Sequence, residues 1–182
     1  MKYRTKESET NKTNCVMSEN MIELFIRQIS HELHNYTLYR TFANYFGNEG
    51  LTILEEYYKL RADEELLHHN WLTKFLNERG VMFKYPAISE ITEEFNDYIT
   101  PFELTVDVEE ETTKMIYEMV TLAQKENDWI TFAWLMQNDE VNGALVLEQN
   151  EEESISNLAL DIAMQEGSWF DKQRAIMKAY KG

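Results

Sequence analysis

The chain has 182 residues, which is enough for one domain with a sizeable core and short for two. Apolar residues make up 43% of it and aromatic residues 13%, a composition typical of globular proteins. The formal charge of -16 argues against a nucleic-acid backbone or an anionic membrane as partner, and favours a protein that gathers cations.

The N-terminal residues and the cysteine content indicate the cellular compartment of the protein. Cys15 is the single cysteine, so a disulfide framework is excluded and a reducing compartment is favoured. The first residues are hydrophilic and lack the apolar core of a secretion signal. No apolar run approaches the roughly 20 residues that span a bilayer. We therefore expect a soluble, cytoplasmic protein with no membrane partner.

Long amphipathic segments without glycine or proline dominate the chain, and they predict helices. Residues 1–17 are expected to be a flexible tail. Ser18 is a good N-cap for a first helix that runs to about Phe46, with apolar residues at helical spacing. A second helix is predicted over residues 51–79, with Gly80 as its C-terminal stop.

The second half of the chain continues the helical pattern after a long connection. Residues 81–101 contain both prolines, and a connection of that length in a helical bundle predicts a crossover rather than a tight hairpin. A third helix is expected over residues 102–126, a fourth reaching Gly167, and a short fifth over about 168–178. The prediction is an all-α bundle that forms one domain over residues 18–182.

Each of the four long predicted helices carries polar groups where helical spacing calls for apolar side chains. These residues are Glu32 in the first helix, Glu65 and His68 in the second, Glu109 in the third, and Gln149 and Glu152 in the fourth. Burying several carboxylates together is costly unless a cation neutralises them. The pattern therefore predicts a metal centre inside the bundle. Mixed carboxylate and imidazole ligands suit iron, manganese or zinc, and a carboxylate-rich pair of sites favours iron.

Simpler interpretations exist for each of these groups taken alone. Glu65 and His68, taken alone, could be a solvent-exposed pair of side chains one helical turn apart. Glu32 could instead form an ion pair with Arg61, which lies on the core face of the second helix. One such group on each of four helices makes a set of independent explanations improbable, so the metal centre is the preferred hypothesis.

Other polar residues are assigned to the surface. His31, His34 and His69 lie off the core faces, and we expect them at the surface or at subunit contacts rather than among the ligands. Glu153 is expected on a solvated helix face. The nine methionines and the tyrosines at helical spacing are attributed to the core.

The residues that surround the predicted ligands resemble those of ferritins of the bacterial non-haem branch, over about residues 18–180. The matching stretches are Glu32-Leu33 with Tyr39 two turns later, Glu64-Glu65-Leu66-Leu67-His68, Leu122-Ala123-Gln124-Lys125-Glu126-Asn127-Asp128, and Glu148-Gln149-Asn150-Glu151-Glu152-Glu153. Each stretch alone is weak, but together they are specific to the family.

The resemblance implies a set of iron ligands. One iron would bind Glu32, Glu65 and His68. A second would share Glu65 and add Glu109 and Glu152, with Gln149 and Tyr39 near the pair. A third, on the cavity side, would use Glu64, Glu148, Glu151 and Glu152.

The resemblance also implies a fold and an activity. The fold would be a ferritin-like four-helix bundle with a long crossover between the second and third helices and a short fifth helix. The activity would be that of a ferroxidase, which oxidises Fe²⁺ with oxygen or peroxide and stores the Fe³⁺ as mineral in a homo-oligomeric cage of about 24 subunits. Two alternatives remain open: a ferritin-like shell with an impaired centre, and a helical interaction module without metal.

Two features distinguish this chain from related families. Rubrerythrins and bacterioferritins carry a second Glu-x-x-His on the fourth helix, where this chain has Gln149-x-x-Glu152. Bacterioferritin places its haem-binding methionine after the glutamate of the second helix, where this chain has Leu66. We therefore expect iron but no haem.

One departure from the bacterial ferritin pattern concerns the spacing before the fourth-helix ligands. The chain is longer between Glu109 and Gln149, and the surplus is placed around Met136–Gly143. Either a loop bulges out near the start of the fourth helix, or the third and fourth helices are both longer. An ungapped comparison would put Asn142 or Gly143 where the glutamine belongs. The gapped interpretation is preferred because the residues after the fourth helix then also match.

Overall fold

A computed structural model describes residues 17–136 and 145–182, and these residues form helices and connections without a strand. The helices are α1 (Glu19–Asn48), α2 (Thr52–Glu78), α3 (Thr100–Glu126), α4 (Trp129–Met136), α5 (Leu145–Met164) and α6 (Trp169–Lys181). The predicted N-terminal tail, apart from Met17, lies outside the described residues. So does the predicted insertion after Met136.

Residues with specific capping geometry fix the helix ends, which lie close to those predicted. The Ser18 side chain accepts a hydrogen bond from the Met21 amide at 3.1 Å and so caps α1. Gly80, with a φ of +74°, follows the end of α2 in the left-handed conformation that favours glycine. Asn127 takes the same conformation at the end of α3, with a φ of 57°.

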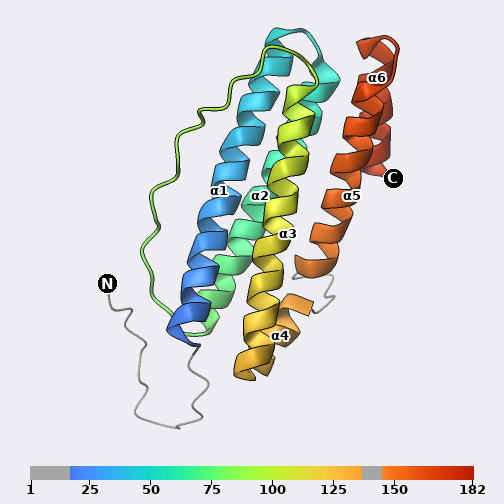
Figure 1. The fold of residues 1–182 in the computed structure, drawn as a ribbon. Coiled ribbons are helices and arrows are strands. Elements are labelled where there is room, and N and C mark those ends of the chain that lie inside the picture. Colours follow the sequence, from blue (N-terminus) through green and yellow to red (C-terminus); the bar gives the residue numbers. More distant parts are fainter. Residues whose placement is uncertain (1–16, 137–144) are drawn as a thin grey trace.

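The long helices form an elongated bundle in which α1 packs along α2, and α3 packs along α5 and against α1. Residues 79–99 run back along the outside of α1 from one end of the bundle to the other (Figure 1). Because the connection returns the chain to the end where α2 began, α2 and α3 run parallel. The predicted crossover is confirmed.

The predicted fourth helix corresponds to two described helices, α4 and α5, on either side of residues 137–144, which lie outside the described residues. The short helix α4 begins where the Asp128 carboxylate accepts hydrogen bonds from the Thr131 amide at 3.2 Å and the Thr131 hydroxyl at 2.7 Å. Arg79, at the end of α2, forms an ion pair with Asp128 at 3.1 Å and holds this turn against the bundle. The helix α5 starts at Leu145 and ends at Met164, before Gly167.

Two apolar clusters fill the two ends of the bundle, and a polar layer lies between them. One cluster contains Phe25, Leu72 and Phe75, with the Trp134 ring 4.3 Å from Phe75. The other contains aromatic and aliphatic side chains from five helices, among them Tyr39, Phe46, Tyr58, Phe102, Ala159 and Ile176. Because α1 and α2 are antiparallel, the residues between the clusters on each helix meet at mid-height. The predicted ligands occupy this layer.

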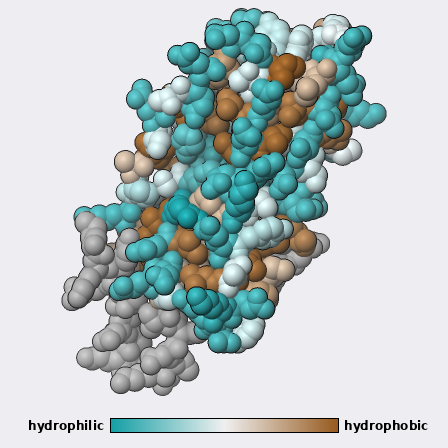
Figure 2. Space-filling view, in the orientation of Figure 1, coloured by the Kyte–Doolittle hydropathy of each residue, from teal (hydrophilic) through white to brown (hydrophobic). Residues whose placement is uncertain are grey.

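Hydrophilic side chains cover much of the face seen in Figure 2, where they follow the helices as ridges with hydrophobic surface between them in the upper half. None of the helices in the described part of the chain carries an apolar stretch long enough to cross a bilayer. The apolar side chains of the two clusters pack the helices against one another.

Candidate metal centre

Four helices bring the predicted ligands together at the middle of the bundle. The helix α1 supplies Glu32, α2 supplies Glu65 and His68, α3 supplies Glu109, and α5 supplies Gln149 and Glu152. Residues three apart on a helix share a face, which is why both α2 groups and both α5 groups point inward. All six side chains are buried, with Glu152 the most exposed at 5%.

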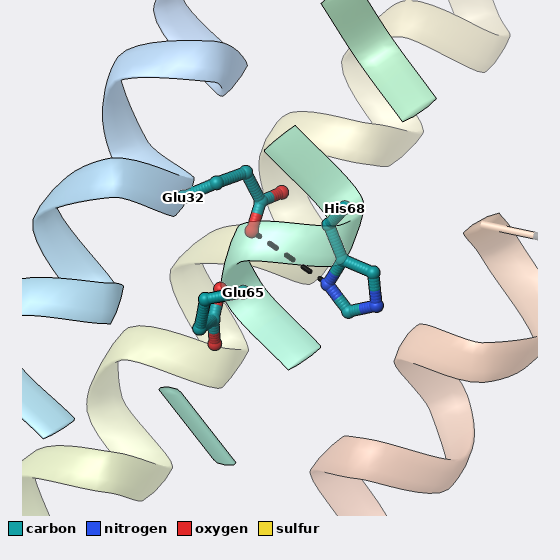
Figure 3. A group of neighbouring side chains, drawn as sticks. All are labelled: Glu32, Glu65 and His68. Atoms are coloured by element: carbon teal, nitrogen blue, oxygen red, sulfur yellow. Dashed lines mark ion pairs between the residues drawn. The ribbon is translucent and has the colours of Figure 1, made fainter. Parts of the chain in front are cut away.

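The first group of ligands joins α1 to α2. Ligand atoms of Glu32, Glu65 and His68 all lie within 4.8 Å of one another. Figure 3 shows the Glu32 carboxylate facing the imidazole, with 3.7 Å between Glu32 Oε2 and His68 Nδ1. Gln28 donates a hydrogen bond to the other oxygen, Glu32 Oε1, at 2.6 Å and so orients the carboxylate.

The second group joins α2 to α3 and α5. Ligand atoms of Glu65, Glu109 and Glu152 also lie within 4.8 Å of one another, so Glu65 belongs to both groups. The Gln149 side-chain amide donates to Glu109 Oε2 at 2.7 Å, and the Tyr39 hydroxyl donates to Glu109 Oε1. The residues that the gapped interpretation assigned to the fourth helix therefore reach the centre.

A third group lies beside the first two. His68 Nε2 and Glu148 Oε2 are 2.7 Å apart, and these residues form a possible metal group with Glu152. Two other residues predicted for a cavity-side site lie differently. Glu64 accepts a hydrogen bond from the Tyr180 hydroxyl at 2.6 Å, and Glu151 is exposed on the far face of α5. Neither belongs to a three-residue metal group within the described residues.

Several buried atoms in this layer have no hydrogen-bond partner among the described residues. Six of them are Glu32 Oε2, Glu65 Oε2, both ring nitrogens of His68, Glu148 Oε2 and Glu152 Oε2, although His68 Nε2 and Glu148 Oε2 lie within ion-pair distance of each other. Buried polar atoms are normally paired, so this many orphans in one place require an explanation. All six are carboxylate oxygens or imidazole nitrogens, which are the donors that iron, manganese and zinc take. The layer therefore fits a metal ion chemically.

Burial makes two of the carboxyls poor acids. Burial raises the pKa of Glu65 well above its ordinary value, and the charges of Glu109 and Glu32 raise it further. Burial also raises the pKa of Glu152 to about 8, although the charge of Arg61 opposes the rise. These two carboxyls therefore hold a proton more tightly than an ordinary glutamate, and a metal ion that binds them competes with that proton.

The remaining pair is held in its charged form. Burial would raise the pKa of Glu32, but contacts with His68 and Glu65 outweigh it and lower that pKa to about 2. Burial also disfavours the imidazolium, but the charges and hydrogen bonds of Glu152, Glu148 and Glu32 raise the pKa of His68 well above its ordinary value. Without metal, an imidazolium thus compensates the Glu32 charge.

The sequence pattern did not identify the partners of Arg61. This side chain is 1% exposed and forms ion pairs with Glu109 and Glu152, the latter at 3.2 Å, and a longer one with Glu64 at 3.6 Å. The alternative pairing of Arg61 with Glu32 is wrong, because Glu32 faces His68 instead. Arg61 lies one helical turn before Glu65, so the sequence places it on the same core face as the predicted ligands. This shared face was the feature that could have indicated a contact with them.

The other histidines lie outside the three groups, as expected. His31 contacts the Thr112 hydroxyl at 2.8 Å, and both His31 and His34 are partly exposed. The expected surface position is wrong for His69, which is 8% exposed and stacks against Tyr85 with ring centres 5.5 Å apart. Tyr85 of the long connection covers this part of α2, and the path of that connection is not a local feature of the sequence.

Comparison with known proteins identifies the family to which this fold belongs. The ferritin-like domain pattern matches residues 22–141 of this chain. The chain belongs to the ferritin family. Bacterial non-heme ferritin of Staphylococcus aureus (strain USA300) is 25% identical over 120 residues, which cover 66% of this chain and 72% of that protein. A probable bacterial non-heme ferritin-like protein of Haemophilus influenzae is 27% identical over 146 residues, which cover 80% and 84% of the two chains.

Solved ferritins share the fold of this family member over most of their length. An open pore ferritin from the hyperthermophilic archaeon Archaeoglobus fulgidus superposes with a TM-score of 0.79 at 28% identity, covering 89% of this chain and 97% of that one. A humanized archaeal ferritin gives the same score and identity, and 94% of its chain is covered. The all-α ferritin-like prediction is thereby confirmed.

Proposed function

We propose that this ferritin-family chain stores iron and oxidises Fe²⁺ to Fe³⁺ at the buried centre. The observation that carries the proposal is the set of orphaned carboxylate and imidazole atoms shared by α1, α2 and α5 in one dry layer. Such atoms are stabilised when a cation binds them. The names of the relatives, bacterial non-heme ferritins, support the same conclusion.

Each ligand has a role in this proposal. Glu32, Glu65 and His68 bind one substrate ion, and Glu65 bridges to a second ion held by Glu109 and Glu152. Gln149 orients Glu109 through its 2.7 Å hydrogen bond, and Tyr39 donates to the same carboxylate. Glu148, with His68 and Glu152, offers a third position through which oxidised iron leaves the pair.

The electron balance requires two iron ions for each two-electron acceptor. Two Fe²⁺ each lose one electron, and one O₂ takes both electrons with two protons to give hydrogen peroxide. When peroxide is the acceptor, it takes two electrons and two protons and yields two molecules of water. Carboxylates favour this direction because, as hard oxygen ligands, they bind Fe³⁺ more tightly than Fe²⁺.

Storage requires assembly, and we propose a homo-oligomeric cage of about 24 subunits. The net charge of -16 supports the gathering of Fe²⁺ by an acidic interior. A cage would elute at roughly 500 kDa, while a single chain has a mass of 21.7 kDa. We also propose a cytoplasmic location, because the only cysteine, Cys15, leaves no disulfide to form within the chain.

Aerobic addition of Fe²⁺ to metal-free protein tests the ferroxidase activity. The rise of near-ultraviolet absorbance reports Fe³⁺ formation. We expect Glu65→Ala to slow that rise about tenfold or more, because it removes the bridging ligand. Asp63→Ala is the matched control, because it removes an exposed carboxylate two residues earlier on α2. Equal rates for the two variants would reject the centre as the site of oxidation.

A specific contact also favours the second candidate, a storage shell whose centre oxidises iron slowly. Arg61 already pairs with two carboxylates that the second iron would need. In that case the wild-type cage assembles and fills with iron at a rate close to that of Glu65→Ala. The same absorbance experiment therefore separates the two functions.

A further inference from the structure

The Arg61 side chain crosses from α2 to the carboxylates of α3 and α5. One terminal nitrogen, Nη2, donates to Glu109 Oε1 and to Ser156 Oγ, the latter at 3.3 Å. The other, Nη1, donates to Glu152 Oε1 at 3.2 Å. The guanidinium carbon also lies 5.6 Å from the centre of the Tyr39 ring. The planar guanidinium is thus fixed by contacts on several sides.

The two halves of the centre differ in how well their polar atoms are paired. Glu109 accepts hydrogen bonds from Arg61, Tyr39 and Gln149, so both of its oxygens have partners. In the other half, Glu32 Oε2 and His68 Nδ1 face each other at 3.7 Å, and neither has a hydrogen-bond partner in the described part of the chain. Glu109 is therefore fully paired with the help of Arg61, whereas Glu32, His68 and the second oxygen of Glu152 leave atoms without a hydrogen-bond partner.

A guanidinium that bridges two buried carboxylates performs the same electrostatic task as a metal ion. It supplies positive charge to groups that cannot be buried as bare anions. A divalent ion bound by the same oxygens would replace the hydrogen bonds of Arg61. It would also meet the repulsion of a positive charge within contact distance, in a layer that excludes water. The ion and the guanidinium thus exclude one another at Glu109 and Glu152.

We propose that Arg61 occupies the second metal position of the resting centre, so that the metal-free protein binds one divalent ion tightly, at Glu32, Glu65 and His68. A second ion binds at Glu65, Glu109 and Glu152 only after the guanidinium has moved away. The inference deepens the proposed function and rests on it, because it assigns an order to the two metal positions of the same centre.

The structure also offers a place for the displaced guanidinium. Glu64, on the same helix, has an oxygen 3.6 Å from Arg61 Nη1, and its side chain is 32% exposed at the edge of the centre. Movement towards Glu64 would keep Arg61 in an ion pair while it releases Glu109 and Glu152. Arg61 is in this sense a positioning residue that sets when the second site opens.

Equilibrium titration with Zn²⁺, which is not oxidised, measures this order without any turnover. Calorimetry of the metal-free assembled protein counts the tight sites per chain. We expect Arg61→Gln to gain one tight site relative to the wild type. Arg27→Gln is the matched control, because it removes an arginine from an exposed ion pair with Glu118, and it should keep the wild-type count. The same number of tight sites in all three proteins would overturn the proposal.

A further variant distinguishes failure of this inference from failure of the proposed function. His68→Ala should lose the tight Zn²⁺ site of the wild type. If it binds Zn²⁺ like the wild type, the centre itself is wrongly assigned. Arg61→Met provides a second neutral substitution if Arg61→Gln does not assemble. The number of tight Zn²⁺ sites in the wild type is also a test by itself. Two equally tight sites per chain would contradict the proposal that Arg61 occupies the second metal position.

Discussion

The Arg61 guanidinium and the Glu109 carboxylate form an ion pair inside the bundle, with their side chains 1% and 0% exposed. An arginine so deeply buried is retained only when its charge is paired, and Glu109 and Glu152 supply that pairing. The pair links α2 to α3 in the layer that separates the two apolar clusters. The same ion pair therefore affects both the stability of the bundle and the metal binding proposed for the centre.

Arg61→Gln should destabilise the metal-free protein, because it leaves the buried carboxylates without their cation. We expect a loss of about 3 kcal/mol in the free energy of unfolding, measured with urea at fixed protein concentration. Arg27→Gln, in an exposed pair, should cost less than about 1 kcal/mol. Saturating Zn²⁺ should restore more stability to Arg61→Gln than to the wild type. Similar losses of unfolding free energy in the two variants would show that the buried ion pair stabilises the protein no more than the exposed one.

His68→Ala should weaken Zn²⁺ binding at the first position by about 100-fold or more, since it removes the only nitrogen ligand of that group and loss of a ligand costs more than loss of a group that orients it. The control is His69→Gln, which changes the next residue of the same helix, a buried histidine outside the metal groups. Calorimetric titration of metal-free protein measures both. Weakening of equal size in the control would point to a general loss of α2 structure.

Glu148→Gln should leave the initial rate of Fe²⁺ oxidation close to that of the wild type while lowering the rate of later turnovers. The reason is that Glu148 lies 2.7 Å from His68 Nε2 but outside the two groups proposed to bind the reacting pair. Stopped-flow absorbance with repeated Fe²⁺ additions separates the first turnover from later ones. Glu151→Gln, which changes an exposed carboxylate on the same helix, is the control. A slower first turnover in Glu148→Gln would place Glu148 in the reacting pair.

Asp97 makes the stability of the α3 N-terminus depend on pH. Its carboxylate accepts hydrogen bonds from the amides of Ile99 and Thr100, at 2.7 and 2.8 Å, and these contacts lower its pKa. A lowered pKa stabilises the fold above the unfolded value of about 4, and this stabilisation is lost as the pH falls through the folded value.

Asp97→Ala should therefore lower the thermal midpoint by about 2 °C at pH 7, and the difference should shrink as the pH falls below the unfolded pKa of about 4. Thermal unfolding followed by circular dichroism measures this, with Glu94→Ala in the same exposed connection as control. A midpoint difference that grows towards low pH would have the wrong sign for this mechanism.

The buried positions of the candidate ligands were predictable because these residues break a pattern. Glu32, Glu65, Glu109 and Glu152 each stand where helical periodicity requires an apolar side chain, and periodicity depends only on neighbouring residues. The structure brings all four into the same layer. The crossover was predictable for a similar reason, since the length and prolines of residues 81–101 are local features.

Other features depend on packing between distant segments and could not be predicted. Periodicity placed Arg61 on the core face, but the choice between Glu32 and Glu109 as its partner depends on how α1, α3 and α5 lie around α2. The burial of His69 depends on the path of the long connection. The turn between α3 and α4 is held by Asp128, which pairs with Arg79 from a different helix.

Anomalous diffraction from crystals loaded with Fe²⁺ without oxygen would test the proposed metal centre most directly. We expect the strongest peak between Glu32, Glu65 and His68, with the second position, beside Glu109 and Glu152, filled only when the Arg61 side chain has turned away. Iron bound solely to surface carboxylates, with His68 still paired to Glu32, would contradict the assignment.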